Sequence, residues 1–215
     1  LEFLSNYDSL TGLPNRNLFL DRLEQALAYT SWEKRPLAVV SISINRFKRI
    51  NESLGHEAGD QVLQQLANFL RHVMRERDTV ARMAGNEFAL ILTEMSREAD
   101  IARIMSKIFN GLTEPFSVAN HDVMIDVSVG ISMPPADGQH ADVLLKHAEY
   151  ARHSVKRHGV TENTYQHYSP DLGHQISDTL AWENAIRRAI DEDEFELYYQ
   201  PQYDMGTNAA IGLEA

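Results

Sequence analysis

The chain has 215 residues, 43% hydrophobic and 24% charged, proportions typical of a packed globular domain with additional segments. It contains no cysteine, which excludes a disulfide scaffold, a thiolate zinc site and a cysteine nucleophile. The net charge of −11 disfavours a nucleic-acid polymer as partner, whereas a single nucleotide needs only a few local cations. No apolar run approaches the about 20 residues of a membrane-spanning helix, and no signal peptide is visible, so we expect a cytoplasmic chain without membrane contact.

Helix-like and strand-like patterns alternate along most of the chain. Residues 15–32 carry apolar side chains at helical spacing, and residues 36–45 read as a strand rich in β-branched residues. Further along the chain we expect helices at 59–74, 97–112 and 141–159, a hairpin of strands at 79–84 and 88–93, and a strand at 121–132. This alternation predicts an α/β sandwich with a central mixed sheet flanked by helices.

The C-terminal part has a different pattern. A boundary falls near residues 166–173, where Pro170 suits a helix start, and residues 176–193 read as an amphipathic helix that runs into a cluster of acids. Two strand-like runs follow, around a turn at 204–208. Because about twenty residues cannot bury a core of their own, we expect the opening hairpin of a second domain.

The stretch RMAGNEFAL, residues 82–90, joins two short apolar runs through Gly85 and Asn86. Gly and Asn tolerate the backbone conformations of a tight hairpin turn. Such turns are usually connectors, so the alternatives are a solvated loop and the remains of a catalytic site that includes Arg82, Asn86 and Glu87.

Five segments resemble, in order and spacing, GGDEF domains, the diguanylate cyclases. They are DSLTGLPNR at 8–16, NRFKRINESLGHEAGD at 45–60, RERD at 75–78, AGNEF at 84–88 and DVSVGIS at 126–132. The tail at 196–215 resembles the start of an EAL phosphodiesterase domain, with Glu214 and Ala215 as the first letters of its motif. The resemblance implies a degenerate GGDEF domain of nucleotide-cyclase-like fold at 1–168, a linker helix at 169–193 and the N-terminal hairpin of a truncated EAL domain at 194–215.

Active members of that family condense two GTP molecules into cyclic di-GMP with divalent metal held by carboxylates. Here the metal positions implied by the resemblance are degenerate: Ser43 and Asn45 stand where the family has aspartates, and Asn86 replaces the acidic third letter of the signature. Only Glu87 keeps its carboxylate, as a vestigial catalytic residue. Since Mg²⁺ prefers anionic oxygens, we expect no bound metal and no cyclase activity.

The residues that hold the substrate in the family are better preserved. By family position, Asn51 and Asp60 would face the guanine and sugar, and Lys48 and Lys156 would meet the phosphates. Arg82 is a further candidate nucleotide-binding residue. Taken without the resemblance, Asp60 reads as an acid near a helix N-terminus, and the two lysines as solvated surface charges.

The RERD segment resembles the family's inhibitory R-x-x-D site for cyclic di-GMP. The arginine fork of Arg75 suits the O6 and N7 edge of guanine, and Asp78 can accept from its N1 and N2 donors. Lys107, or alternatively Arg103, would add a cation from the following helix. The alternative is an exposed salt bridge between Arg75 and Asp78 that contributes little.

These observations favour a catalytically inactive regulatory module that binds cyclic di-GMP, GTP or both. It requires no cofactor, and Mg²⁺ would at most accompany GTP weakly. Further partners are a second copy of the chain and an EAL domain in cis, which leaves the longer protein as a candidate phosphodiesterase while this fragment is no enzyme. The alternatives are an active cyclase with an atypical metal shell and a dimerisation scaffold that binds no nucleotide.

Overall fold

The computed structural model describes residues 5–33, 36–93, 95, 99–157, 163–172 and 185–214. Internal contacts divide the chain into two compact units, Leu1–Gly173 and His174–Ala215. Within the described residues, no helix combines the length and the hydropathy needed to cross a membrane.

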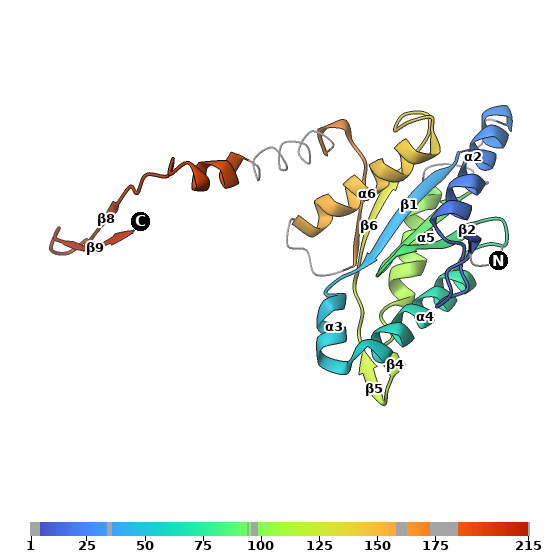
Figure 1. The fold of residues 1–215 in the computed structure, drawn as a ribbon, viewed down its shortest axis with the longest axis horizontal. Helices are drawn as coiled ribbons and strands as arrows, with labels where there is room; N and C mark the ends of the chain where they lie inside the picture. Colours follow the sequence, from blue (N-terminus) through green and yellow to red (C-terminus); the bar gives the residue numbers. More distant parts are fainter. Residues whose placement is uncertain are drawn as a thin grey trace. The chain divides into compact units, whose positions relative to one another are not determined.

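The first unit is built on a five-stranded mixed sheet with the strand order β2-β3-β1-β6-β7 (Figure 1). All neighbouring strands are antiparallel except β6 and β7, which run parallel. The strands are β1 (Ala38–Ile44), β2 (Thr79–Ala84), β3 (Glu87–Leu92), β6 (Val127–Ser132) and β7 (Thr164–His167). The predicted α/β fold with a central mixed sheet is therefore confirmed.

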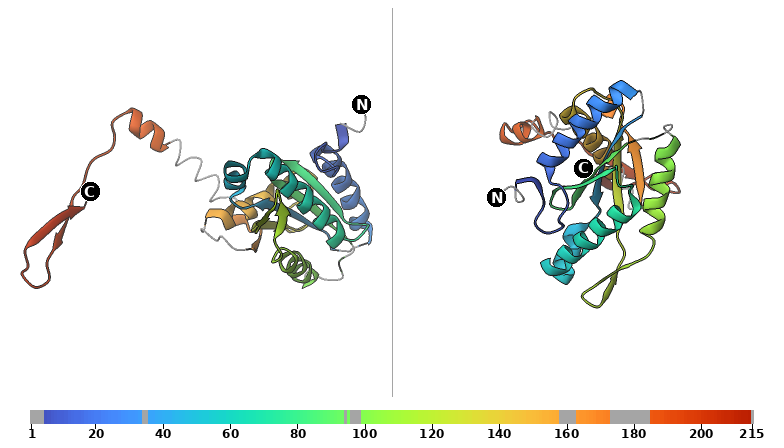
Figure 2. Two further views of the ribbon diagram at one scale, coloured as in Figure 1. Left: turned by 90° about the horizontal axis from the view of Figure 1, so that it is seen from below. Right: turned by 90° about the vertical axis from the view of Figure 1, so that its right-hand side faces the viewer.

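Helices cover both faces of this sheet, as Figures 1 and 2 show. On one face, α2 (Arg16–Glu33) and α6 (Ala141–Arg157) bury Phe19, Leu23 and Leu144 against β1, β2 and β3. On the other face, α4 (His56–Val73) and α5 (Ala99–Gly111) enclose the larger core cluster. The helix α3 (Phe47–Leu54) follows β1 directly and packs on α4.

The central strand β1 is almost entirely apolar because it contributes to both hydrophobic cores. All seven of its residues are buried, with Val40 and Ile42 in the larger core and Val39 in the core under α2 and α6. A strand covered on both faces requires apolar side chains at nearly every position. Ser41 and Ser43 interrupt this pattern and are buried as well.

Four elements differ from the predictions. The helix α3 was not predicted, and α4 begins at His56 instead of residue 59. The single strand expected at 121–132 is two strands, β5 (His121–Val123) and β6, because β5 pairs with β4 (Phe116–Val118) in a separate ribbon. The edge strand β7 was also not predicted.

The second unit contains a short helical segment at 185–191 and a hairpin. Strands β8 (Gln200–Tyr203) and β9 (Ala210–Glu214) pair antiparallel around the predicted turn, where Asp204 accepts hydrogen bonds from the amides of Gly206 and Thr207. Its apolar side chains are exposed, including Tyr198, Ile211 and Leu213. The first half of the helix predicted at 176–193, residues 176–184, lies outside the described residues.

Candidate functional site

The signature turn lies beside the end of the central strand. Gly85, with a φ of 53°, supplies the backbone conformation that the turn between β2 and β3 requires. The sheet register places Ser43 opposite Glu87 on β3 and opposite Ser128 on β6. The fold thus brings Ser43, Asn86 and Glu87 to one edge of the sheet, as the resemblance implied.

Asn86 forms hydrogen bonds with residues at the position where the resemblance places a metal. Its Nδ2 donates to the carbonyl oxygen of Ile44 at 2.7 Å and to the Oγ of Ser43 at 3.3 Å. Ser43 is fully buried. A divalent cation needs oxygen lone pairs directed at it, but here an amide N–H group already faces these oxygens. The residues at this edge therefore do not fit the metal that the family uses.

The other substituted position, Asn45, is also occupied by internal bonds. Its backbone N–H donates to Asp126 O at 2.7 Å, and its Oδ1 accepts from Ser128 Oγ at 2.7 Å. Its Nδ2 is buried without a hydrogen-bond partner. Asn45 therefore ties the end of β1 to the start of β6. Among the residues that the structure describes, no three His, Asp or Glu side chains come close enough to hold a metal ion.

Arg152, on α6, is a site residue that lies outside the sequence motifs and was not predicted. Its Nη2 donates to Glu87 Oε1 at 2.8 Å, and its Nε donates to Ser41 Oγ at 2.9 Å. The Arg152 side chain is 1% exposed, whereas that of Glu87 is 33% exposed. The one carboxylate left in the signature is therefore paired with a buried guanidinium.

Gly130 on β6 allows α6 to come this close to the sheet. A methyl group on Gly130 would lie 2.0 Å from the carbonyl oxygen of Ala148 and 2.2 Å from the backbone N of Arg152. Only a residue without Cβ permits this packing. Leu144, Ala148 and Arg152 follow one another at intervals of four residues, so the arginine interrupts an apolar helix face. A charged residue at an otherwise apolar position of the helix is the sequence feature that could have identified Arg152.

A second acid, Glu149, lies near this pair. Burial raises the pKa of its carboxyl group, Arg152 opposes that rise and the negative charge of Glu87 adds to it. The charge of Arg152 thus acts on two acids, and Arg16 also lowers the pKa of Glu149.

The predicted nucleotide-binding residues have different environments. Asn51 on α3 lies against Gly59 of α4, and its Oδ1 is buried without a partner, while the adjacent Asp60 is exposed. Lys48 is exposed and pairs with Glu52 at 3.6 Å. The structure therefore places Asn51 and Asp60 close together. The side chain of Lys156 lies outside the described residues.

Arg82 holds two loops together. Its guanidinium donates to both carboxylate oxygens of Asp8, at 2.9 and 3.0 Å, and to the carbonyl oxygen of Gly85, at 3.1 and 2.8 Å. Asp8 also accepts from the backbone and hydroxyl of Thr11. These contacts favour a structural role for Arg82, fixing the signature turn to the N-terminal loop, over the nucleotide contact that was predicted.

Replacing Asp8 by Asn should lower the free energy of unfolding by about 2 kcal/mol at neutral pH, because charge-assisted hydrogen bonds are lost. Burial raises the pKa of Asp8, but hydrogen bonds from Thr11 and Arg82 outweigh it, and the net pKa lies below its usual range. A carboxyl with a lowered pKa stabilises the fold above its unfolded pKa, and this contribution is lost as the pH falls.

Urea unfolding between pH 7 and pH 3 measures both effects. The wild type should lose more stability on acidification than Asp8→Asn does. Asp21→Asn, at an exposed helix position, is the control and should change stability little. An equal acid response of the wild type and Asp8→Asn would contradict the assignment.

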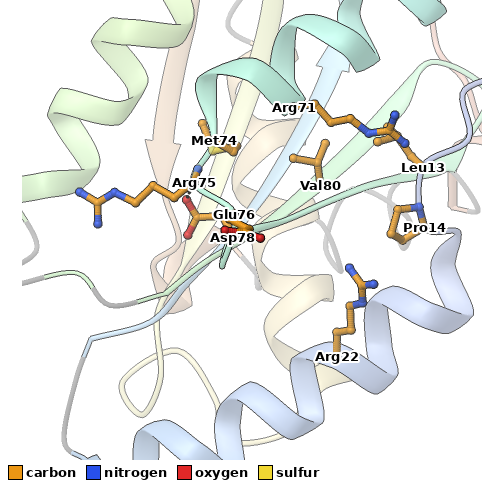
Figure 3. A pocket seen from close by; sticks show the side chains of 9 residues that line it. All are labelled: Leu13, Pro14, Arg22, Arg71, Met74, Arg75, Glu76, Asp78 and Val80. Carbon is orange, nitrogen blue, oxygen red and sulfur yellow. Dashed lines mark hydrogen bonds between the residues drawn. The ribbon is translucent and has the colours of Figure 1, made fainter.

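The RERD segment forms the turn between α4 and β2. Asp78 accepts from the backbone N–H of Arg75 and of Thr93, each at 3.1 Å. The guanidinium of Arg75 extends away from this carboxylate and is exposed (Figure 3). The salt bridge considered as the alternative is therefore not formed in this arrangement. Lys107 donates to Val73 O at 3.1 Å and so lies near the segment, whereas Arg103 pairs with Asp100.

A pocket of about 210 Å³ adjoins this turn. In Figure 3 the acids Glu76 and Asp78 lie between Arg75 on one side and Arg71 and Arg22 on the other. It is lined by Leu13, Pro14, Arg22, Arg71, Met74, Arg75, Glu76, Asp78 and Val80. The pocket thus combines donors and acceptors suited to a polar, anionic ligand.

The sheet topology and the turn motif define a domain of nucleotide-cyclase-like fold. The model of the family described as "Diguanylate cyclase, GGDEF domain" matches residues 5–162, and the chain belongs to this family.

Individual proteins are similar to this chain in sequence and structure. The cyclic di-GMP phosphodiesterase NbdA of Pseudomonas aeruginosa is 35% identical over 100% of the chain, which corresponds to 27% of NbdA. The GGDEF domain of TpbB from the same species, whose full-length protein is named a diguanylate cyclase, superposes with a TM-score of 0.75 at 34% identity, covering 80% of this chain and 99% of that structure.

A third relative carries a ligand. The GGDEF domain of DgcB from Caulobacter crescentus, solved in complex with cyclic di-GMP, has a TM-score of 0.67 and 27% identity, with 75% of this chain and 93% of that structure covered. The chain spans between 26% and 30% of the length of the first curated relatives that it matches.

Proposed function

We propose that this chain is a catalytically inactive GGDEF domain that serves as a regulatory nucleotide-binding module in a cyclic di-GMP signalling protein. One observation is the main support for the proposed loss of catalysis. The side-chain amide of Asn86 is hydrogen-bonded to Ser43 and Ile44, at the position where a cyclase would hold its metal. Phosphoryl transfer depends on a metal to neutralise developing charge. Without that metal, the groups at this edge do not neutralise the charge that develops during the transfer.

The proposed ligand of the RERD turn is cyclic di-GMP. Three features support it: the free extension of Arg75, the adjacent cation of Lys107, and a pocket beside Asp78. An arginine fork can donate two hydrogen bonds to the O6 and N7 atoms of guanine. The relative DgcB binds cyclic di-GMP within the same fold.

GTP is the second proposed ligand, at the former active site. The buried, unpartnered Oδ1 of Asn51 and the exposed carboxylate of Asp60 supply acceptors for guanine and sugar donors. Lys48 is solvent-exposed and available to a phosphate. No cofactor is required, and Mg²⁺ would accompany GTP only weakly.

The change Arg75→Ala tests the proposed cyclic di-GMP site. Removal of a bidentate guanine contact, worth about 1–3 kcal/mol, should weaken cyclic di-GMP binding by about five- to a hundredfold. Isothermal titration of the wild type and the variant measures the change. Arg75 is a cleaner target than Asp78, because the Asp78 carboxylate also holds the turn through two backbone amides.

The matched control is Arg49→Ala, which removes an exposed arginine on α3 and should leave the affinity unchanged. Equal affinities of the wild type and Arg75→Ala would contradict the assignment of the site. No wild-type binding at about tens of micromolar cyclic di-GMP, a concentration that detects affinities near −6 to −7 kcal/mol, would instead favour a dimerisation scaffold.

The longer protein belongs to this proposal as well. NbdA matches the whole chain, including the tail, and is named a phosphodiesterase. We therefore assign residues 194–215 to the start of an EAL domain acting in cis, joined through a linker helix at 169–193 to the GGDEF domain at 1–168. A second copy of the chain is a further proposed partner. Both ligands are intracellular nucleotides, so the proposed compartment is the cytoplasm.

A further inference from the structure

The buried Arg152 and the partly exposed Glu87 pair at the edge where the resemblance places a metal. The guanidinium is bonded to Glu87 at 2.8 Å and to Ser41 at 2.9 Å, and its Nη2 lies 3.5 Å from His153 Nε2. Glu149 is the second acid whose charge it influences. A positive charge is therefore built into this edge of the sheet.

We propose that Arg152 replaces the divalent metal as the counter-charge of Glu87 and so closes this edge to metal ions. Arginine does not lose its proton in proteins, so its charge stays at every accessible pH. A carboxylate that accepts a charge-assisted hydrogen bond at 2.8 Å has one oxygen fewer for a cation. A metal ion would have to displace a guanidinium that is 1% exposed.

The packing of α6 prevents the arginine from withdrawing. The helix backbone at Arg152 and Ala148 lies directly against Gly130, which fixes where the Arg152 side chain starts, and the side chain itself is packed to 1% exposure. Ser41, buried on the central strand, fixes its Nε. The Nη1 atom is buried and has no partner, which leaves one donor for a further acceptor. An aspartate restored at position 43 would thus face a cation that is already present.

This inference rests on the proposed loss of metal chemistry. Its test measures the affinity for a metal ion and does not depend on whether a nucleotide binds. The test starts from the double variant Ser43→Asp/Asn86→Asp, which restores two acids. In this background Arg152 is kept, changed to Gln, or changed to Lys. Glutamine retains a donor for Ser41 without the charge, and lysine retains the charge.

The readout is Mn²⁺ binding, followed by calorimetry and by the electron paramagnetic resonance of free Mn²⁺. The Arg152→Gln form should bind Mn²⁺ at least about tenfold more tightly than the forms with Arg or Lys, a difference of about 1.4 kcal/mol. Equal Mn²⁺ affinity of the three forms would overturn the proposal.

Circular dichroism establishes first that each variant is folded. Should the triple variant not fold, the same comparison is made in the single Asn86→Asp background, which removes the amide N–H and places a second acid beside Glu87. Mn²⁺ should then raise the melting temperature of Asn86→Asp/Arg152→Gln, with no such rise in Asn86→Asp. A metal-independent melting temperature in Asn86→Asp/Arg152→Gln would count against the proposal. Failure of cyclic di-GMP binding leaves this result unaffected, so the two proposals fail separately.

Discussion

The purified chain, supplied with GTP and Mg²⁺ or Mn²⁺, is expected to form cyclic di-GMP at least about a thousandfold more slowly than an active cyclase domain under the same conditions. Loss of several kcal/mol of transition-state stabilisation by metal accounts for a change of this size. The structural reason is that Asn86 donates its N–H group to Ser43 and Ile44, while Glu87 is committed to Arg152. Liquid chromatography of the product over several hours measures the rate.

The GGDEF domain of TpbB is a suitable positive control, since it shares the fold and its full-length protein is named a diguanylate cyclase. Co-purified nucleotide must be removed beforehand, because released cyclic di-GMP would imitate synthesis. Product that accumulates at a steady rate above the buffer control would refute the expectation and favour an active cyclase with an atypical metal shell. The double variant Ser43→Asp/Asn86→Asp should remain nearly inactive while Arg152 is present.

The second large effect concerns the stability of the fold. Glu87→Leu should lower the free energy of unfolding by about 3 kcal/mol, because it leaves Arg152 charged and buried without its partner. Arg152→Leu should cost about 1 kcal/mol or less, since the leucine continues the apolar face of α6 and Glu87, at 33% exposed, can be hydrated. The double variant should be no less stable than Arg152→Leu alone.

Urea unfolding followed by circular dichroism measures this cycle. The matched control is the exposed pair of Lys48 and Glu52, 88% and 60% exposed, whose removal should change stability little. Additive effects of the two changes at Arg152 and Glu87 would show that the pair is not energetically coupled.

Much of the sheet was predictable from local pattern. The strand β1 and the hairpin of β2 and β3 are dense runs of apolar and β-branched residues, and their buried faces fix the register. The helix α3 was not predicted because it is short and none of its residues is buried. The strand β7 is only four residues long, with two of them exposed, so alternation gave no signal there.

Only those site residues that belong to a sequence motif could be predicted. The motif spacing located Ser43, Asn86 and Glu87, and the register of β1 and β3 brings them together. Arg152 and Glu87 are 65 positions apart, and Asp8 and Arg82 are 74 apart. Pairings over such distances depend on how α6 and the N-terminal loop dock on the sheet, which local sequence does not encode.

The complete burial of Ser43 also has an evolutionary consequence. An aspartate that arose at this position alone would stand opposite Glu87 with no exposure to water, adding a second negative charge to an edge that holds one arginine. Loss of Arg152 alone would cost little, because Glu87 is 33% exposed and can be hydrated, but it would restore no acid. A new acid at position 43 is therefore unfavourable by itself, and loss of Arg152 by itself leaves only one carboxylate in the signature turn. A set of acids able to hold a metal requires both kinds of change together.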